Sequence, residues 1–150
     1  AKGAHPILVT PTSRRRFDEN GKSVNTHGDY PDAVRWVAAK ENVPLIELNG
    51  MTAILFNALG VDNSTKAFVH YPAGTFPGQT RTLKDNTHFS TYGAYEVSKC
   101  VIEGMKKADL EIVKYLRPDY SGFDPAQPDS FESFKWNLGS FTENEKPDGN

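Results

Sequence analysis

Two short apolar segments, each followed by an amphipathic helical pattern, constrain the fold of this chain more than any other feature. The first segment, Ile7–Thr10, ends at Pro11, and the second, Leu45–Leu48, follows Pro44. Short apolar runs bounded by proline are typical of buried strands. The resulting order of strand, helix, strand and helix predicts an α/β fold with a parallel sheet covered by helices.

The spacing of apolar residues predicts three helices. The first covers Tyr30–Asn42, and the second follows Asn49 as its N-cap and ends at Gly60. The third follows Ser90 as its N-cap and runs to Lys107 or beyond. The apolar face of the second helix consists of Met51, Ile54, Leu55, Ala58 and Leu59.

Long loops and a polar tail complete the prediction. The loops are expected at residues 12–28 and 61–84, and a short helical segment at residues 110–116. We expect a domain over residues 1–116 and an extended Pro/Gly/Asp-rich tail over residues 117–150, which packs on the surface and is disordered at its end. The large apolar anchors of this tail are Phe123, Phe131, Phe134 and Trp136.

Composition argues against several classes of function. A net charge of −2 gives no reason to expect a nucleic-acid or membrane partner, and the basic run Arg14–Arg16 lacks interleaved aromatic residues. No apolar run approaches the roughly 20 residues that a membrane helix needs. Cys100 is the only cysteine, so no intrachain disulfide can form. The start at Ala1, without an initiator methionine, leaves a processed protein, a recombinant piece and a fragment all open.

Asp85 and His88 form the strongest chemical signal in the chain. An aspartate three residues before a histidine, in a short polar loop at a helix start, can accept the proton on one imidazole nitrogen. The other nitrogen is then free to act as a general base. The alternative is a hydrogen bond that only shapes the entry to the helix. A metal site that adds His70 matches no common zinc spacing, so no metal and no cofactor are predicted.

The stretch Asp85–Ser90, with Gly93 and Ala94 after it, resembles the last conserved block of the SGNH (GDSL-type) hydrolases, in particular the rhamnogalacturonan acetylesterase group. In that family the block supplies two members of a Ser-His-Asp triad. The resemblance therefore implies that Asp85 is the orienting carboxylate and that His88 is the general base.

The resemblance extends towards the N-terminus. Leu8–Thr12 is similar to the fourth strand of the family, and Leu45–Asn49 is similar to its fifth strand. It implies the C-terminal part of a three-layer α/β/α, flavodoxin-like fold, with the first strands missing from this chain. The residue pattern agrees, because two strands are too few to build a parallel sheet that helices cover on both faces.

The chain departs from the family at the nucleophile and the oxyanion hole. Family members place the nucleophile in a Gly-Asp-Ser motif, whereas Gly28–Tyr30 has tyrosine in the serine position. Gly60–Asn63 has the letters of another family block, but in a different order. We therefore expect that this chain lacks both elements and that it is inactive alone.

The resemblance implies a carboxylic ester hydrolase that removes O-acetyl groups from pectin-type (rhamnogalacturonan) saccharides, in an extracytoplasmic location. Arg14 and Arg15 follow the end of a strand, where they can meet a uronic-acid carboxylate or remain solvated. Tyr71 can stack on a sugar ring or serve as a local anchor.

The alternative function is a non-catalytic fragment, or a binding and assembly module. Such a module completes its sheet with a second copy or another partner along the exposed edge of Ile7–Thr10. A homodimer, or pairing with a missing N-terminal segment, is therefore expected.

Overall fold

The structure, a computed structural model, describes residues 3–136 of the chain. Its elements in chain order are β1 (Leu8–Val9), α1 (Tyr30–Glu41), β2 (Leu45–Ile46), α2 (Leu48–Asn63), the 3₁₀ helix η1 (Ser64–Ala67), β3 (Phe68–Tyr71), β4 (Leu83–Phe89), α3 (Thr91–Lys107) and the 3₁₀ helix η2 (Glu111–Tyr115). None of the helices among the described residues is long and apolar enough to cross a membrane.

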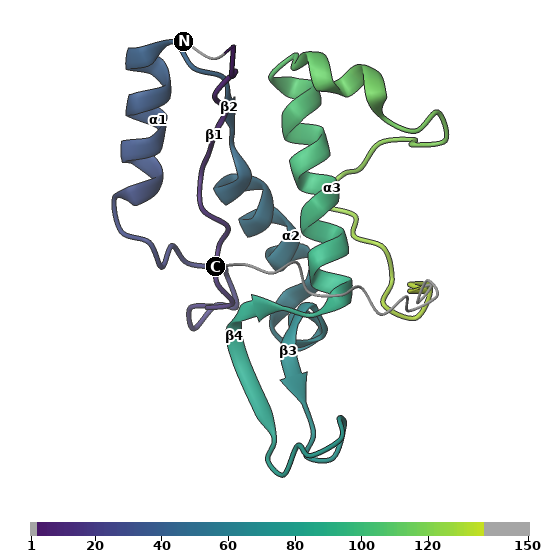
Figure 1. Ribbon diagram of the computed structural model, residues 1–150. Coiled ribbons are helices and arrows are strands. Elements are labelled where there is room, and N and C mark those ends of the chain that lie inside the picture. Colours follow the sequence, from purple (N-terminus) through teal and green to yellow (C-terminus); the bar gives the residue numbers. More distant parts are fainter. Residues whose placement is uncertain (1–2, 137–150) are drawn as a thin grey trace, which may run out of the picture.

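The two predicted strands pair in parallel, as expected. Leu8 lies opposite Leu45 and Val9 lies opposite Ile46. Thr10 extends the pairing by donating its N–H to the carbonyl of Ile46 at 3.0 Å. Helix α1 connects the strands and contacts β1, while α3 contacts β2, so the pair lies between these two helices (Figure 1). The predicted α/β class and the parallel pairing are confirmed, and the parallel sheet has two strands in the described residues.

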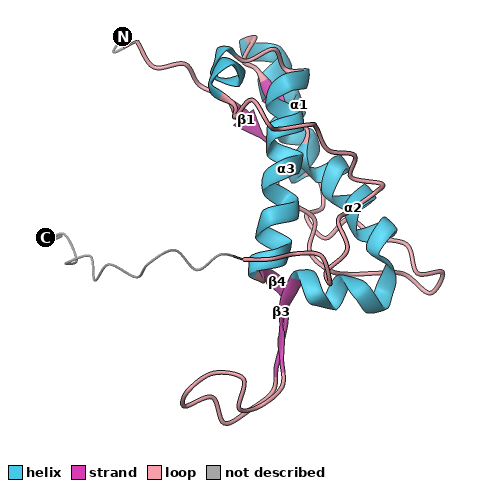
Figure 2. Ribbon diagram, turned by 90° about the vertical axis from the view of Figure 1, so that its right-hand side faces the viewer, coloured by secondary structure: helices cyan, strands magenta, loops and turns pink. Residues whose placement is uncertain are grey.

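The prediction of a loop over residues 61–84 is wrong. Strands β3 and β4 form an antiparallel hairpin, and its connection contains the turn residues that suggested a loop. Phe68 and Phe89 pair at its base, where both rings pack near Phe56. The rest of the hairpin projects from the helices (Figures 1 and 2) and has few buried side chains, so it lacks the apolar pattern of a strand.

Local capping explains the helix boundaries. Helix α2 begins before Asn49 because the Glu47 side chain accepts a hydrogen bond from the Gly50 N–H at 3.3 Å. The predicted end at Gly60 is a kink, with φ of 72°, after which the helix resumes to Asn63. Ser90 caps α3 as predicted, and its hydroxyl accepts from the Gly93 N–H at 3.1 Å.

The core lies where α3 packs against β2, α2 and η1, with Phe68 of β3 in the same cluster. Its buried apolar residues are Ile46, Leu48, Leu55, Phe56, Ala67, Phe68, Tyr92, Val97 and Cys100. Gly93 and Gly104 let α3 approach closely, since a Cβ at either position would overlap Ala67 or Ile46. Burial raises the pKa of the Cys100 thiol to about 12, as expected of an apolar helix residue.

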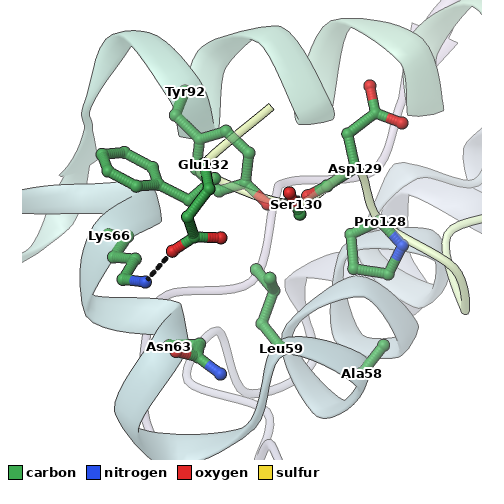
Figure 3. Close-up of a pocket in the computed structure, with 10 residues that line it drawn as sticks. Ala58, Leu59, Asn63, Lys66, Tyr92, Pro128, Asp129, Ser130 and Glu132 are labelled. Atoms are coloured by element: carbon green, nitrogen blue, oxygen red, sulfur yellow. Dashed lines mark hydrogen bonds and ion pairs between the residues drawn. The ribbon is translucent and has the colours of Figure 1, made fainter. Parts of the chain in front are cut away.

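The segment after η2 runs back along α3 (Figure 1) and packs on it through aromatic rings. Tyr92 meets the rings of Phe131 and Phe134 at centroid distances of 5.3 and 5.5 Å. A cavity of about 240 Å³ lies between this segment, α2 and η1, where Lys66 forms an ion pair with Glu132 at 2.8 Å (Figure 3).

Asp129 fixes this segment to α3. The amine of Lys99 lies 2.8 Å from both the Asp129 and the Glu96 carboxylates, and the Glu96 side chain is fully buried. Tyr92 donates its hydroxyl to the Asp129 carbonyl at 2.6 Å. Burial raises the pKa of Glu96 and Lys99 opposes that rise, so the charge of Glu96 depends on its partner.

Replacing Lys99 by methionine is expected to lower the free energy of unfolding by about 3 kcal/mol, because it leaves the Glu96 carboxylate buried without its cation. Urea denaturation at pH 7 measures the change. Lys106→Met is the matched control, since Lys106 pairs with Glu103 at the same spacing in the same helix but is more exposed. Its cost should stay below about 1 kcal/mol. An equal loss of unfolding free energy in the two variants would show that the burial of Glu96 does not determine the cost.

Candidate active site

Asp85 and His88 form the hydrogen-bonded pair that the sequence predicted, although they lie in β4 and not in a loop. The Asp85 Oδ2 atom is 2.6 Å from His88 Nδ1. Asp85 Oδ1 accepts hydrogen bonds from the N–H groups of Thr87 at 2.6 Å and His88 at 3.0 Å. The carboxylate thus fixes the ring through Nδ1, and the His88 side chain is 78% exposed.

The hydrogen bonds lower the pKa of Asp85 from 3.8 to about 2, with the bond to the His88 ring as the largest cause. The N–H groups of His88 and Thr87 lower the pKa further. Asp85 is therefore a carboxylate across the neutral range. A carboxylate at Nδ1 leaves Nε2 as the nitrogen that accepts a proton, which is the geometry of a general base with its orienting group.

His88→Ala is expected to raise the pKa of Asp85 from about 2 towards 3.8. The variant removes the hydrogen bond to the His88 ring, which is the largest cause of the lowered pKa. The rise should be incomplete, since the backbone N–H donors of residues 87 and 88 remain. The pH dependence of the Asp85 side-chain ¹³C chemical shift measures it. His5→Ala is the control, and an unchanged titration in His88→Ala would show that the ring is not bound to Asp85 in solution.

A groove of about 590 Å³ adjoins this pair on the hairpin. Its lining residues are Val69, Arg81, Thr82, Leu83, Lys84, Asp85 and His88. Arg81 and Lys84 are both exposed. The groove therefore places the Asp85–His88 pair beside two basic residues, an arrangement suited to an anionic ligand.

The other predicted site residues, Arg14, Arg15 and Tyr71, have different environments in the structure. The Arg14 side chain is exposed, whereas Arg15 is half-buried and binds Asn86 through Nη1 at 3.2 Å. Tyr71 packs edge-on against Phe76 at a centroid distance of 5.0 Å, within the hairpin.

Asn86 is the residue that sequence reasoning missed. It lies between Asp85 and His88, and its side-chain oxygen is 2.8 Å from His70 Nε2. Its position between Asp85 and His88 was the sequence signal that could have identified it. In the described part of the chain, no cluster of three or more His, Cys, Asp or Glu side chains is arranged to hold a metal ion.

The two partial matches to family motifs do not approach a catalytic arrangement. Tyr30 opens α1 and is 73% exposed, and Gly60–Asn63 forms the kinked end of α2. Within residues 3–136 no serine or threonine hydroxyl is hydrogen-bonded to His88.

Comparison with known proteins gives two clear relatives from Bacillus subtilis (strain 168). The chain is 44% identical over 115 residues to rhamnogalacturonan acetylesterase RhgT and 34% identical over 115 residues to the probable rhamnogalacturonan acetylesterase YesY. Each match covers 77% of this chain, but 50% of RhgT and 48% of YesY. The chain thus spans about half the length of these curated relatives. No protein-family model matches it.

The crystal structure of protein YxiM from Bacillus subtilis has a similar fold. The match has a TM-score of 0.58 at 22% identity and covers 73% of this chain and 28% of YxiM. At this identity the likeness concerns the fold alone. Over 115 residues the chain is similar in sequence to RhgT and YesY, which confirms the resemblance to the rhamnogalacturonan acetylesterase group found at Asp85–Ser90.

Proposed function

We propose that this chain is the C-terminal part of a carbohydrate esterase and supplies its general base and orienting carboxylate. The observation behind the proposal is the 2.6 Å contact between Asp85 Oδ2 and His88 Nδ1, in a chain homologous to rhamnogalacturonan acetylesterases. The proposed substrates are O-acetyl esters on rhamnogalacturonan-type saccharides. An extracytoplasmic location is part of this proposal and rests on the resemblance alone.

The proposed reaction passes through an acyl-enzyme on a serine that lies outside this chain. His88 Nε2 removes the hydroxyl proton as the serine oxygen attacks the acetyl carbonyl, and Asp85 stabilises the imidazolium. His88 then gives the proton to the departing sugar oxygen. Water repeats the sequence and releases acetate. Donors to the oxyanion, each contributing about 3 kcal/mol, would also come from outside the chain.

Several basic residues support an acidic saccharide as the substrate. Arg81 and Lys84 line the groove beside His88, and Arg14 is exposed on the loop after β1. Arg14 remains a proposed contact for a uronic-acid carboxylate, and Tyr71 remains a proposed stacking surface. Arg15 has most of its donors bound within the chain, which makes it the weakest of the proposed substrate contacts.

A fusion protein tests this proposal. The chain alone should release no acetate from acetylated rhamnogalacturonan, and a serine-directed fluorophosphonate should not label it. Fusion to the part of RhgT that the chain does not match should restore both reactions. Labelling of the chain alone would overturn the proposal that the nucleophilic serine lies outside this chain. A folded fusion that binds phosphonate but releases no acetate would overturn the substrate assignment.

The second candidate, an assembly module, is favoured by the outer edge of the parallel pair. In the described residues β1 pairs with β2 on one side only, and Val9 is 42% exposed. Native mass spectrometry separates the candidates. A stable homodimer that fusion to the RhgT segment does not dissolve would favour the module.

A further inference from the structure

Arg15 connects three separate parts of the fold through its guanidinium and its backbone. Its Nε donates to the Ser64 hydroxyl at 3.0 Å, and its Nη2 donates to the Val61 carbonyl at 2.6 Å. Its Nη1 donates to the Asn86 side-chain oxygen at 3.2 Å, and its backbone N–H donates to the Asn86 carbonyl at 2.9 Å. Arg15 therefore ties the end of α2 to strand β4.

Asn86 lies in an irregular part of β4, where regular backbone pairing with β3 is interrupted. Phe68 pairs with Phe89 and His70 pairs with Lys84, so one residue of β3 faces the four residues 85–88 of β4. Such a bulge interrupts the ladder and leaves its residues without regular strand partners. Two residues support this part of the strand. His70 of β3 lies 2.8 Å from the Asn86 side-chain oxygen, and Arg15 supplies two hydrogen bonds from outside the hairpin.

The contacts of Asp85 are all local. Its two oxygens bind the His88 ring and the N–H groups of Thr87 and His88, and these partners lie within the bulge itself. The local bonds fix Asp85 and His88 relative to each other. They do not fix the pair relative to α2 and the body of the fold.

We propose that Arg15 is a positioning residue, which holds the bulge of residues 85–88 at a set place on the fold and so places the His88 ring. The fork geometry of a guanidinium suits this role, because it binds acceptors on two different segments at once. The consequence for catalysis rests on the proposed esterase function, since small displacements of a base from its reacting atoms reduce the rate strongly. The positioning itself does not rest on that function.

Two variants of Arg15 separate geometry from charge. Arg15→Lys keeps the positive charge and loses the fork, and Arg15→Gln loses both. Arg14→Gln is the matched control, since Arg14 is the exposed neighbour. The readout is hydrogen exchange at the backbone amide of residue 15, which reports its bond to the Asn86 carbonyl in the bulge, normalised to buried amides of α3. We expect both Arg15 variants to accelerate this exchange at least about tenfold, and the control to leave it unchanged.

A second variant covers the case in which an Arg15 variant does not fold. Ser64→Ala removes one anchor of the guanidinium and leaves Arg15 in place, so it should accelerate the same exchange by a smaller factor of about threefold. Unchanged exchange at the amide of residue 15 in folded Arg15→Lys, or in Ser64→Ala if neither Arg15 variant folds, would overturn the proposal.

Kinetics in the fusion protein then distinguish positioning from substrate binding. We expect Arg15→Lys to lower kcat about tenfold and to leave KM within about twofold. A raised KM with unchanged kcat and unchanged amide exchange would make Arg15 a substrate contact and overturn its positioning role. Faster exchange in a fusion that shows no esterase activity would support the positioning and count against the proposed function alone.

Discussion

Replacing Gly93 by alanine is expected to lower the free energy of unfolding by at least about 4 kcal/mol, or to prevent folding. The new Cβ would overlap the carbonyl oxygen of Ala67 and lie 2.7 Å from its carbon. Neither group can move easily, because Ala67 is fully buried and its carbonyl accepts the Ser90 N–H at 3.1 Å. Relief of the overlap would push the start of α3 away from η1 and β3.

Gly50→Ala is the matched control, because Gly50 occupies the same position in α2 that Gly93 occupies in α3. Each N–H donates to the side chain of its helix cap. A Cβ at Gly50 would meet only the Glu47 side chain, at 3.7 Å or more. This control should be neutral or stabilise the chain by up to about 1 kcal/mol. Urea denaturation measures both variants, and a small loss in Gly93→Ala would mean that α3 does not dock on Ala67 as described.

Replacing His88 by alanine is expected to lower kcat/KM for acetate release at least about 10³-fold in the fusion with the RhgT segment. In the proposed mechanism, this variant removes the group that takes the serine proton. Asp85→Asn should give a similar loss, because an amide at Nδ1 favours the tautomer that protonates Nε2. Initial rates of acetate release from acetylated rhamnogalacturonan measure both variants.

His5→Ala is the control for these losses, since His5 is exposed and lies in the segment before β1. Its rate should match that of the unchanged fusion. Fluorophosphonate labelling of each variant shows whether the serine site is assembled. A His88→Ala fusion that retains more than about a tenth of the activity would remove His88 from the mechanism.

Helix α3 and the parallel strand pair were predictable from local sequence patterns. Helix α3 follows from the spacing of its apolar residues and from the Ser90 cap, and the parallel pair follows from two short apolar runs. The β3–β4 hairpin was missed because most of it projects into solvent and has no buried face. Strand pairing there depends on contacts between Phe68, Phe89 and Phe56, which are distant in sequence.

The contact between Asp85 and His88 was predictable, whereas the contacts that support the pair were not. The spacing of Asp85 and His88 is local, so residue types and their order were enough to predict that they would meet. The link from Arg15 to Asn86 spans 71 positions and depends on where the bulge lies in β4. A basic run after a strand suggested a ligand contact, because sequence alone does not show that a guanidinium is bound within the fold.

The bulge in β4 divides the hairpin into a fixed base and an exchangeable arm. The pairing of Phe68 with Phe89 lies on one side of residues 85–88, and the arm that contains Tyr71 and Arg81 lies on the other. Changes in the length or sequence of the arm are therefore separated from the Asp85–His88 pair. Arms from other proteins grafted between His70 and Lys84 are therefore expected to change the groove beside His88 and to leave the Asp85–His88 pair intact.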